Sequence, residues 1–185
     1  MLLLLIVVAL IAFEFWRLSV PETVRLRQSW EFETPDGPHT ISDIVELQQM
    51  AAIPYLPGGE VGQSKVIGNI PVSFEVDGNR YFISSHPPML ISNAIAADPI
   101  PPFSMEGLRG TATTGFIRRL RRSNARIEVP LDRVAKFMWV GDRKDTWGGI
   151  AGSRVRLPAF EAAHPGFRLM RVTYTVTNEK EGEVN

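Results

Sequence analysis

One uninterrupted apolar run opens the chain, and the stretches after it alternate between apolar and polar positions. Residues 1–13 are all apolar, and Arg17 follows a glutamate and two aromatic residues. Thirteen helical residues span about 20 Å, whereas a bilayer core needs about 20 apolar residues. Extension to residue 20 nearly reaches that length, with Trp16 at headgroup depth and Arg17 directed outward at the membrane interface. The pattern predicts a membrane anchor helix over residues 1–20.

Two other interpretations of this segment stay open. A cleaved signal peptide has a similar apolar run, but here no Lys or Arg precedes it and no small-x-small pair follows it before Phe13, Phe15 and Trp16. A buried strand or helix of the core is the third interpretation. We place the retained anchor first, the cleaved signal second and the core element third.

The charges beside the segment give conflicting indications of its orientation. Arg17, Arg25 and Arg27 follow it, and the positive-inside rule would then leave the domain in the cytoplasm. Single N-terminal segments of this kind generally export the domain that they precede, and Glu14 and Glu22 lie among the arginines. We favour a single-pass protein of the bacterial inner membrane with a periplasmic domain.

Period-two alternation predicts two hairpins in the first half of the chain. Leu26 to Phe32 alternates, residues 34–38 read TPDGP, and Thr40 to Met50 alternates again with a phase slip that indicates a bulge. Residues 72–76 and 81–83 flank Asp77-Gly78, which is typical of a tight hairpin turn.

The second half is less regular. Residues 86–103 are rich in proline and contain a possible short helix, SNAIAAD, capped by Ser92 or Asn93. Residues 129–141 fit either a strand or a helical turn. The stretch FRLMRVTYTVTNEK predicts a half-buried strand with Met170, Val172, Tyr174 and Val176 on one side.

These patterns predict a mainly β fold. We expect the transmembrane helix to be followed by one antiparallel β-sandwich or barrel-like domain with short helical segments. The 14 prolines and 15 glycines among 185 residues suit many turns and short elements. The expected boundaries are an anchor over 1–20, a spacer or first strand over 21–28, a β-rich domain over 29–178 and a flexible tail over 179–185.

Composition narrows the function classes. Twenty basic residues balance twenty acidic ones, which argues against a dedicated nucleic-acid binder. The chain has no cysteine, so disulfides, thiolate metal sites and a cysteine nucleophile are excluded. We expect no cofactor.

One local excess of basic charge interrupts the neutral background. It could contact anionic lipid headgroups, where each basic residue adds about 1 kcal/mol. A nucleic acid and an acidic protein are the rival targets, and on an exposed strand or turn the charges could simply aid solubility and protect an edge. The residues are Arg118, Arg119, Arg121, Arg122 and Arg126.

No residue pattern predicts a catalytic, cofactor-binding or metal-binding site. Residues 148–153 read GGIAGS, which lacks the lysine of a phosphate-binding loop and fits a surface loop. Charged residues 142–145 near Trp147 fit a solvated loop, and the histidines show no H-x-x-x-H pairing. An enzyme would need a site assembled from distant residues such as His86, Asp142 and Asp145.

The stretch RLRQSWEFETPDGPHTISDIVELQ, after an apolar segment, resembles a group of uncharacterised, mainly proteobacterial proteins. In that group a membrane segment precedes a Thr-Pro-x-Gly turn and a small β-rich domain. VIGNIPVSFEVDGNRYFIS is similar to the next strand pair of the group, and RVTYTVTNE is similar to the closing strand. The chain departs from the group at Ile70-Pro71 and in the basic stretch 118–126. The resemblance implies an architecture and a location, without an activity.

We therefore expect a membrane-anchored envelope protein with a non-catalytic β-rich interaction or structural domain. Its partners would be the bilayer, through residues 1–20, and a membrane protein or a second copy of the chain. The alternatives are an envelope hydrolase with a site of dispersed residues, and a cytoplasm-facing domain that binds anionic lipid or nucleic acid.

Overall fold

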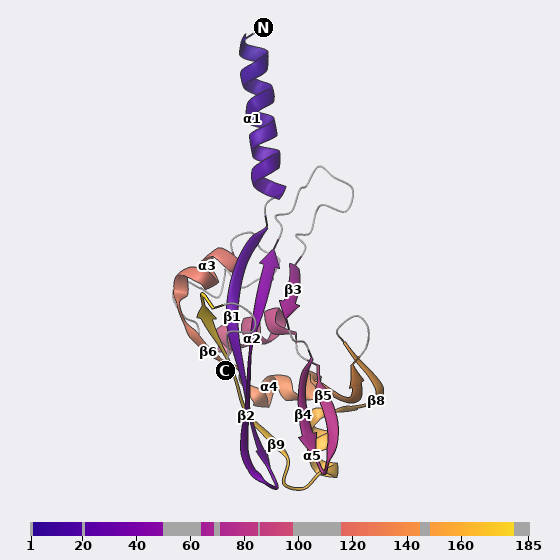
Figure 1. Cartoon of the computed structure of the whole chain (residues 1–185). Coiled ribbons are helices and arrows are strands. Elements are labelled where there is room, and N and C mark those ends of the chain that lie inside the picture. The colour runs from indigo at the N-terminus through magenta and orange to yellow at the C-terminus, as the bar shows by residue number, and fades with distance from the viewer. Residues whose placement is uncertain are drawn as a thin grey trace.

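The computed structural model of the chain describes residues 2–19, 21–49, 64–68, 71–84, 86–97, 116–144 and 149–179. Helix α1 (Leu2–Ser19) projects from one end of a β-rich domain (Figure 1). Among the helices of these residues, none combines the length and the apolar content needed to cross a membrane. Membrane spanning by residues 1–20 therefore stays a proposal.

Five strands form the larger antiparallel sheet, in the order β3-β2-β1-β9-β6. Its middle strand, β1, pairs with β2 along its full length and with β9 on its other side. The tight turn between β1 and β2 is supported by the Thr34 hydroxyl, which donates to the carbonyl of Gly37 over 2.8 Å. The strands are β1 (Glu22–Thr34), β2 (Gly37–Gln49), β3 (Ser64–Gly68), β6 (Arg126–Glu128) and β9 (Arg168–Thr177).

Four strands form the second antiparallel sheet, in the order β4-β5-β7-β8. Asp77 and Gly78 join β4 to β5 with φ values of 52° and 74°, the left-handed pair that a two-residue type I′ turn requires. The predicted Asp-Gly hairpin is confirmed. The strands are β4 (Val72–Val76), β5 (Asn79–Ile83), β7 (Trp139–Lys144) and β8 (Ile150–Arg156).

Short helices pack on the sheets. Helix α2 buries Leu90, Ile91 and Ile95 in the core, and α3 packs on β1 and β2. The helices are α2 (Pro87–Ala97), α3 (Phe116–Ser123), α4 (Leu131–Val134), the 3₁₀ helix η2 (Ala135–Phe137) and α5 (Leu157–Ala163).

One hydrophobic core joins the two sheets. The ring of Phe32 on β1 lies 5.2 Å from that of Phe74 on β4, and Phe74 lies 4.8 Å from Phe167, which precedes β9. Trp30 and Tyr174 of the larger sheet are fully buried in the same cluster. The prediction of a mainly β domain with short helices is confirmed, and its two antiparallel sheets are sandwich-like.

The predicted start of helix α2 was wrong. Helix α2 begins at Pro87, so Ser92 and Asn93 lie inside it and do not cap it. Consecutive prolines suit the first turn because their φ is already helical and the first N–H groups need no partner. His86 acts at this helix start instead, since its Nδ1 accepts from the backbone N–H of Met89 over 3.3 Å.

A β-bulge shifts the expected inward positions of β9. The register between β1 and β9 skips Met170, with Glu31 opposite Arg171 and Phe32 opposite Leu169. Leu169 is therefore buried, and Met170, which was predicted on the inward side, is 51% exposed. No such shift occurs between β1 and β2, where a bulge was expected; Ile44 and Val45 are both buried because both faces of β2 are covered there.

The structure assigns three further stretches of the chain to strands and helical turns. Residues 22–28 belong to β1, which agrees with the first-strand alternative for 21–28, and the stretch 129–141 contains both of its predicted alternatives, helical turns and the start of β7. Ile150 to Ser153 belong to β8 and not to a loop. Gly152 forms a bulge there with a φ of 75°, and a Cβ on it would lie 1.8 Å from Oδ1 of Asp142. Residues 145–148 and 180–185 lie outside the described residues.

Candidate functional site

Four of the five arginines of the basic cluster lie on helix α3, and the fifth, Arg126, lies on β6. Ile117 and Leu120 are buried against the core and fix the helix on the sheet. Arg118, Arg121 and Arg122 lie three and four residues apart, so they share the exposed side of the helix. We call these three residues the arginine face.

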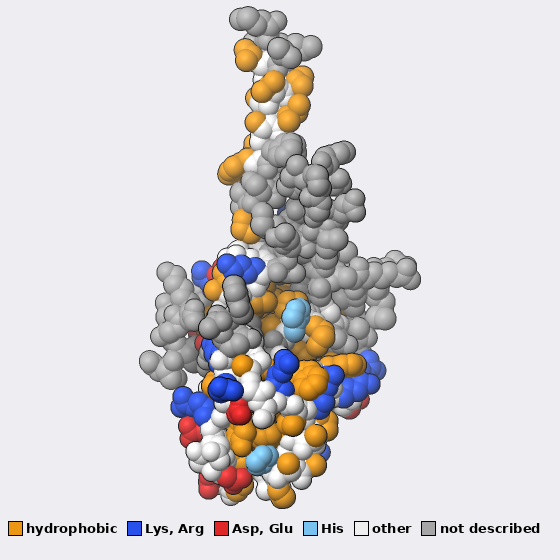
Figure 2. Space-filling model, turned by 90° about the vertical axis from the view of Figure 1, so that its right-hand side faces the viewer, with side chains coloured by type: hydrophobic (Ala, Val, Ile, Leu, Met, Phe, Trp, Pro, Cys, Tyr) orange, Lys and Arg blue, Asp and Glu red, His pale blue; other side chains and the backbone are white. Residues whose placement is uncertain are grey.

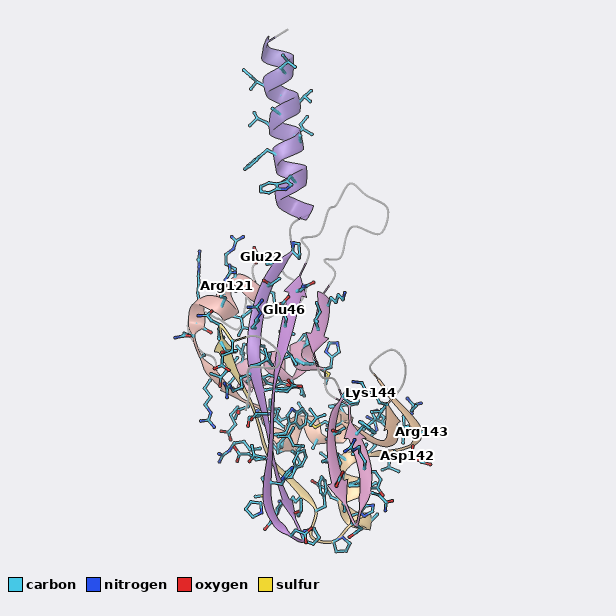
Figure 3. All side chains as sticks on the ribbon, in the orientation of Figure 1. Glu22, Glu46, Arg121, Asp142, Arg143 and Lys144 are labelled. Atoms are coloured by element: carbon cyan, nitrogen blue, oxygen red, sulfur yellow. The ribbon has the colours of Figure 1, made fainter. Side chains whose placement is uncertain are left out.

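The arginine face contacts the first residues of β1. The Arg118 guanidinium forms an ion pair with the carboxylate of Glu22, the first residue of the strand. Nη1 of Arg121 donates to the backbone carbonyl of Thr23 over 3.5 Å. Figure 3 shows Arg121 and Glu22 side by side at the end of the domain from which α1 leaves. The basic cluster therefore lies at the α1 end of the domain.

The other two arginines of the cluster are placed differently. Arg119 is half-buried on α3. Arg126 is exposed on β6, the last strand of the five-stranded sheet. A charge on an edge strand discourages pairing with another chain, and this role for Arg126 stays a prediction.

Helix α1 carries the two residues expected at a membrane interface. Trp16 is 64% exposed, and its ring lies 6.1 Å from that of Phe13. Arg17 also belongs to α1, but its side chain lies outside the described residues. Their role at an interface stays a prediction.

Of the dispersed residues of the hydrolase hypothesis, the structure describes His86 and Asp142, and they do not line the same pocket. Asp142 lines a pocket of about 540 Å³ beside α5, and His86 is not among its lining residues. Asp145 lies outside the described residues. In the part of the chain that the structure describes, no three His, Asp or Glu side chains gather in a way that could hold a metal ion.

Three rings that the sequence patterns did not single out line the Asp142 pocket. Tyr81 of β5 packs edge-on against Phe160 of α5 at 4.8 Å, and the His164 ring lies 4.3 Å from Phe160. Nδ1 of His164 lies 3.4 Å from Oδ2 of Asp77 in the β4–β5 turn. An apolar wall with a few polar groups is typical of a small-molecule pocket. In the sequence, the four-residue spacing of Phe160 and His164 is the signal that could have indicated their contact on one helix face.

A second exposed surface combines aromatic and basic side chains. The Arg156 guanidinium lies 3.8 Å from the centre of the Trp139 ring, and Lys136 lies 5.1 Å from that of Phe137. Trp139 is 37% exposed and Phe137 is 54% exposed. Figure 2, which views the molecule from the side where β8 lies in Figure 1, shows basic and apolar side chains intermixed over the domain. Cation–π contacts of this kind hold exposed aromatic rings in place.

Comparisons with protein families, with curated proteins and with solved structures give no match for this chain. The resemblance to membrane-anchored proteobacterial proteins stays an interpretation of its motifs.

Proposed function

We propose that the chain is a single-pass envelope protein, in which residues 1–20 anchor a non-catalytic β-rich interaction or structural domain. The carrying observation is the exposure of α1. Leu5, Leu10 and Phe13 are 59%, 60% and 54% exposed, and the helix extends away from the domain (Figure 1). Water-soluble surfaces seldom expose contiguous apolar patches of more than a few hundred Å². A bilayer would cover these side chains.

To span a membrane, α1 would need a thin or locally thinned bilayer. Its 18 residues measure about 27 Å, against about 30 Å of hydrocarbon. Bilayers thin locally around a short apolar segment at a modest cost in free energy. Trp16 would then lie in the headgroup region, where tryptophan is enriched.

An interaction role is supported by the two exposed surfaces of the domain. The arginine face and the Trp139–Arg156 surface expose arginine and tryptophan, residue types that are enriched in binding hot spots. A membrane protein or a second copy of this chain is the expected partner, and it should co-purify from native membranes.

Alkaline carbonate extraction and intact-mass measurement test the anchor. We expect the full-length chain to stay in the membrane fraction with residues 1–20 still attached. Val7→Arg with Leu10→Arg should release it, because each charge costs about 2.5–3.5 kcal/mol at the centre of a spanning helix. Val155→Arg, at an exposed apolar position of β8, is the matched control and should stay membrane-bound. A mature protein that begins near residue 17 would show a cleaved signal instead.

The side of the membrane can be tested with one introduced thiol, because the chain has no cysteine. Asp36→Cys places it in the exposed β1–β2 turn. On a periplasmic domain a membrane-impermeant maleimide should label it in intact spheroplasts. Labelling only after lysis would place the domain in the cytoplasm, as in the alternative with a lipid-binding or nucleic-acid-binding domain.

A further inference from the structure

We propose that the arginine face of α3 docks on anionic phospholipid headgroups of the membrane that holds α1. This inference rests on the proposed anchor. It adds a second, electrostatic contact between the domain and the bilayer, and it fixes which end of the domain faces the lipid.

The arginine face lies close in the chain fold to the end of α1. Its contacts are with Glu22 and Thr23, and only residues 20 and 21 separate α1 from β1. Four residue steps from Ser19 to Thr23 reach at most about 14 Å. An anchored α1 therefore keeps the arginine face close to the bilayer surface whatever the tilt of the domain.

Two arginines of the arginine face have positive charges that a headgroup could neutralise. Arg121 and Arg122 are exposed, and neither takes part in an ion pair between described residues. Arg118 is paired with Glu22 and ties the helix to the strand. The buried Ile117 and Leu120 keep the opposite side of α3 on the sheet. These two guanidinium groups, which have no ion pair among the described residues, are thus held on a helix that packs on the sheet.

Charge complementarity and proximity identify the occupant. Arginine binds phosphate oxygens through two parallel N–H groups, so phosphate-bearing headgroups suit this face. The chain is neutral overall, with 20 basic and 20 acidic residues, which gives little general attraction for a nucleic acid. Tethering by α1 raises the effective concentration of lipid headgroups at α3 far above that of a free ligand.

Quenching of a single fluorophore in bilayer nanodiscs tests the docking with the full-length chain. Ser123→Cys carries the label at the end of α3, and Asp36→Cys carries it at the far β1–β2 turn as the positional control. The discs contain phosphatidylcholine alone or with phosphatidylglycerol, plus a trace lipid with a nitroxide on its headgroup. We expect stronger quenching at position 123 in the phosphatidylglycerol discs and little change at position 36. Raising the salt from 0.1 M to 1 M should abolish the difference, because the screening length falls from about 10 Å to about 3 Å.

Charge-removing variants assign the effect to the arginine face. A basic residue near an anionic surface raises the docked population about fivefold, so Arg121→Gln with Arg122→Gln should lower the ratio of docked to undocked domain roughly 25-fold. Arg143→Gln with Arg154→Gln removes the same charge from the β7–β8 hairpin and should leave that ratio unchanged. Matching far-UV circular dichroism spectra would show that both variants are folded.

Each contrary result has a distinct meaning. A chain that does not co-elute with either kind of disc contradicts the anchor itself. A chain that co-elutes, but whose position-123 label is quenched equally in both discs, overturns the docking and keeps the anchor. Equal losses in the two double variants would show an effect of total charge and overturn the role of α3. A response of the label to a DNA duplex, with none to phosphatidylglycerol, would assign the face to nucleic acid.

Discussion

At the scale of single residues, Tyr174 of β9 places a polar hydroxyl in the core. Its side chain is fully buried, and its hydroxyl has no hydrogen-bond partner among the described residues. Burial also raises the pKa of the phenol well above its ordinary value, because the ionised form cannot be solvated there. Tyr174 therefore stabilises the fold through its ring and not through its hydroxyl.

We expect Tyr174→Phe to leave the free energy of unfolding unchanged or to raise it by about 1 kcal/mol. The pKa of Tyr174 is raised in the folded state, and in the unfolded chain it is about 10. Below that pH the phenol is neutral in both states, so its ionisation does not affect the free energy of unfolding. Above that pH the Tyr174 phenol ionises only in the unfolded chain. The free energy of unfolding of the wild type should therefore fall by about 1.4 kcal/mol more per pH unit than that of the variant. Denaturant unfolding between pH 8 and pH 12 measures this, with Tyr81→Phe as control. Equal slopes for wild type and Tyr174→Phe would contradict the prediction.

At the scale of elements, β1 and β2 are joined by a polar cluster on one face of the hairpin. Arg25 and Glu46 are opposite each other in register, with Nε of Arg25 donating to Oε2 of Glu46 over 3.0 Å. Nε2 of Gln48 donates to Oε1 of the same carboxylate over 2.8 Å. These bonds, chiefly that from Gln48, hold the pKa of Glu46 below its ordinary value of 4.5.

The lowered pKa predicts a pH-dependent loss in Glu46→Gln. The ionised carboxylate stabilises the fold above about pH 4.5, and this contribution disappears as the pH falls through the folded value. We expect the variant to lose about 0.5–1 kcal/mol at pH 7 and to match the wild type near pH 3. Unfolding by urea at both pH values measures this, and Glu33→Gln at an exposed position of β1 is the control. A loss of the same size at pH 3 would point to packing.

The elements that local sequence patterns define could be predicted, and features that depend on distant contacts could not. The hairpins at residues 34–37 and 77–78 were predicted because turn chemistry and strand periodicity are local. The exposure of Met170 was not, because the bulge that turns it outward depends on pairing with β1, more than a hundred residues earlier. The arginine cluster was found from its composition. Its place beside Glu22 depends on a contact 96 residues apart in sequence, which periodicity cannot reveal.

At the scale of the whole molecule, Phe74 links the two sheets. It is buried among Phe32, Phe160 and Phe167, which come from the larger sheet, from α5 and from the loop before β9. Because the two sheets share this one core, we expect them to unfold together.

Phe74→Ala should lower the free energy of unfolding by about 3–5 kcal/mol and keep a single transition. Tryptophan fluorescence and far-UV circular dichroism of the protein in detergent should report the same midpoint. Met170→Ala, at a 51% exposed position, is the control and should stay within about 0.5 kcal/mol of the wild type. Separate midpoints for the two probes would show that the sheets are independent units.

The shortness of the connection between α1 and β1, residues 20 and 21, has a mechanical consequence. β1 is the middle strand of the larger sheet and is paired along all 13 of its residues with β2. A pull on α1 along the strand axis therefore loads the hydrogen bonds of this ladder in shear, all at once, and not one after another as in peeling. The domain is attached to its N-terminal helix through the middle strand of its larger sheet, so a force on that helix is resisted by the strands on both sides of β1.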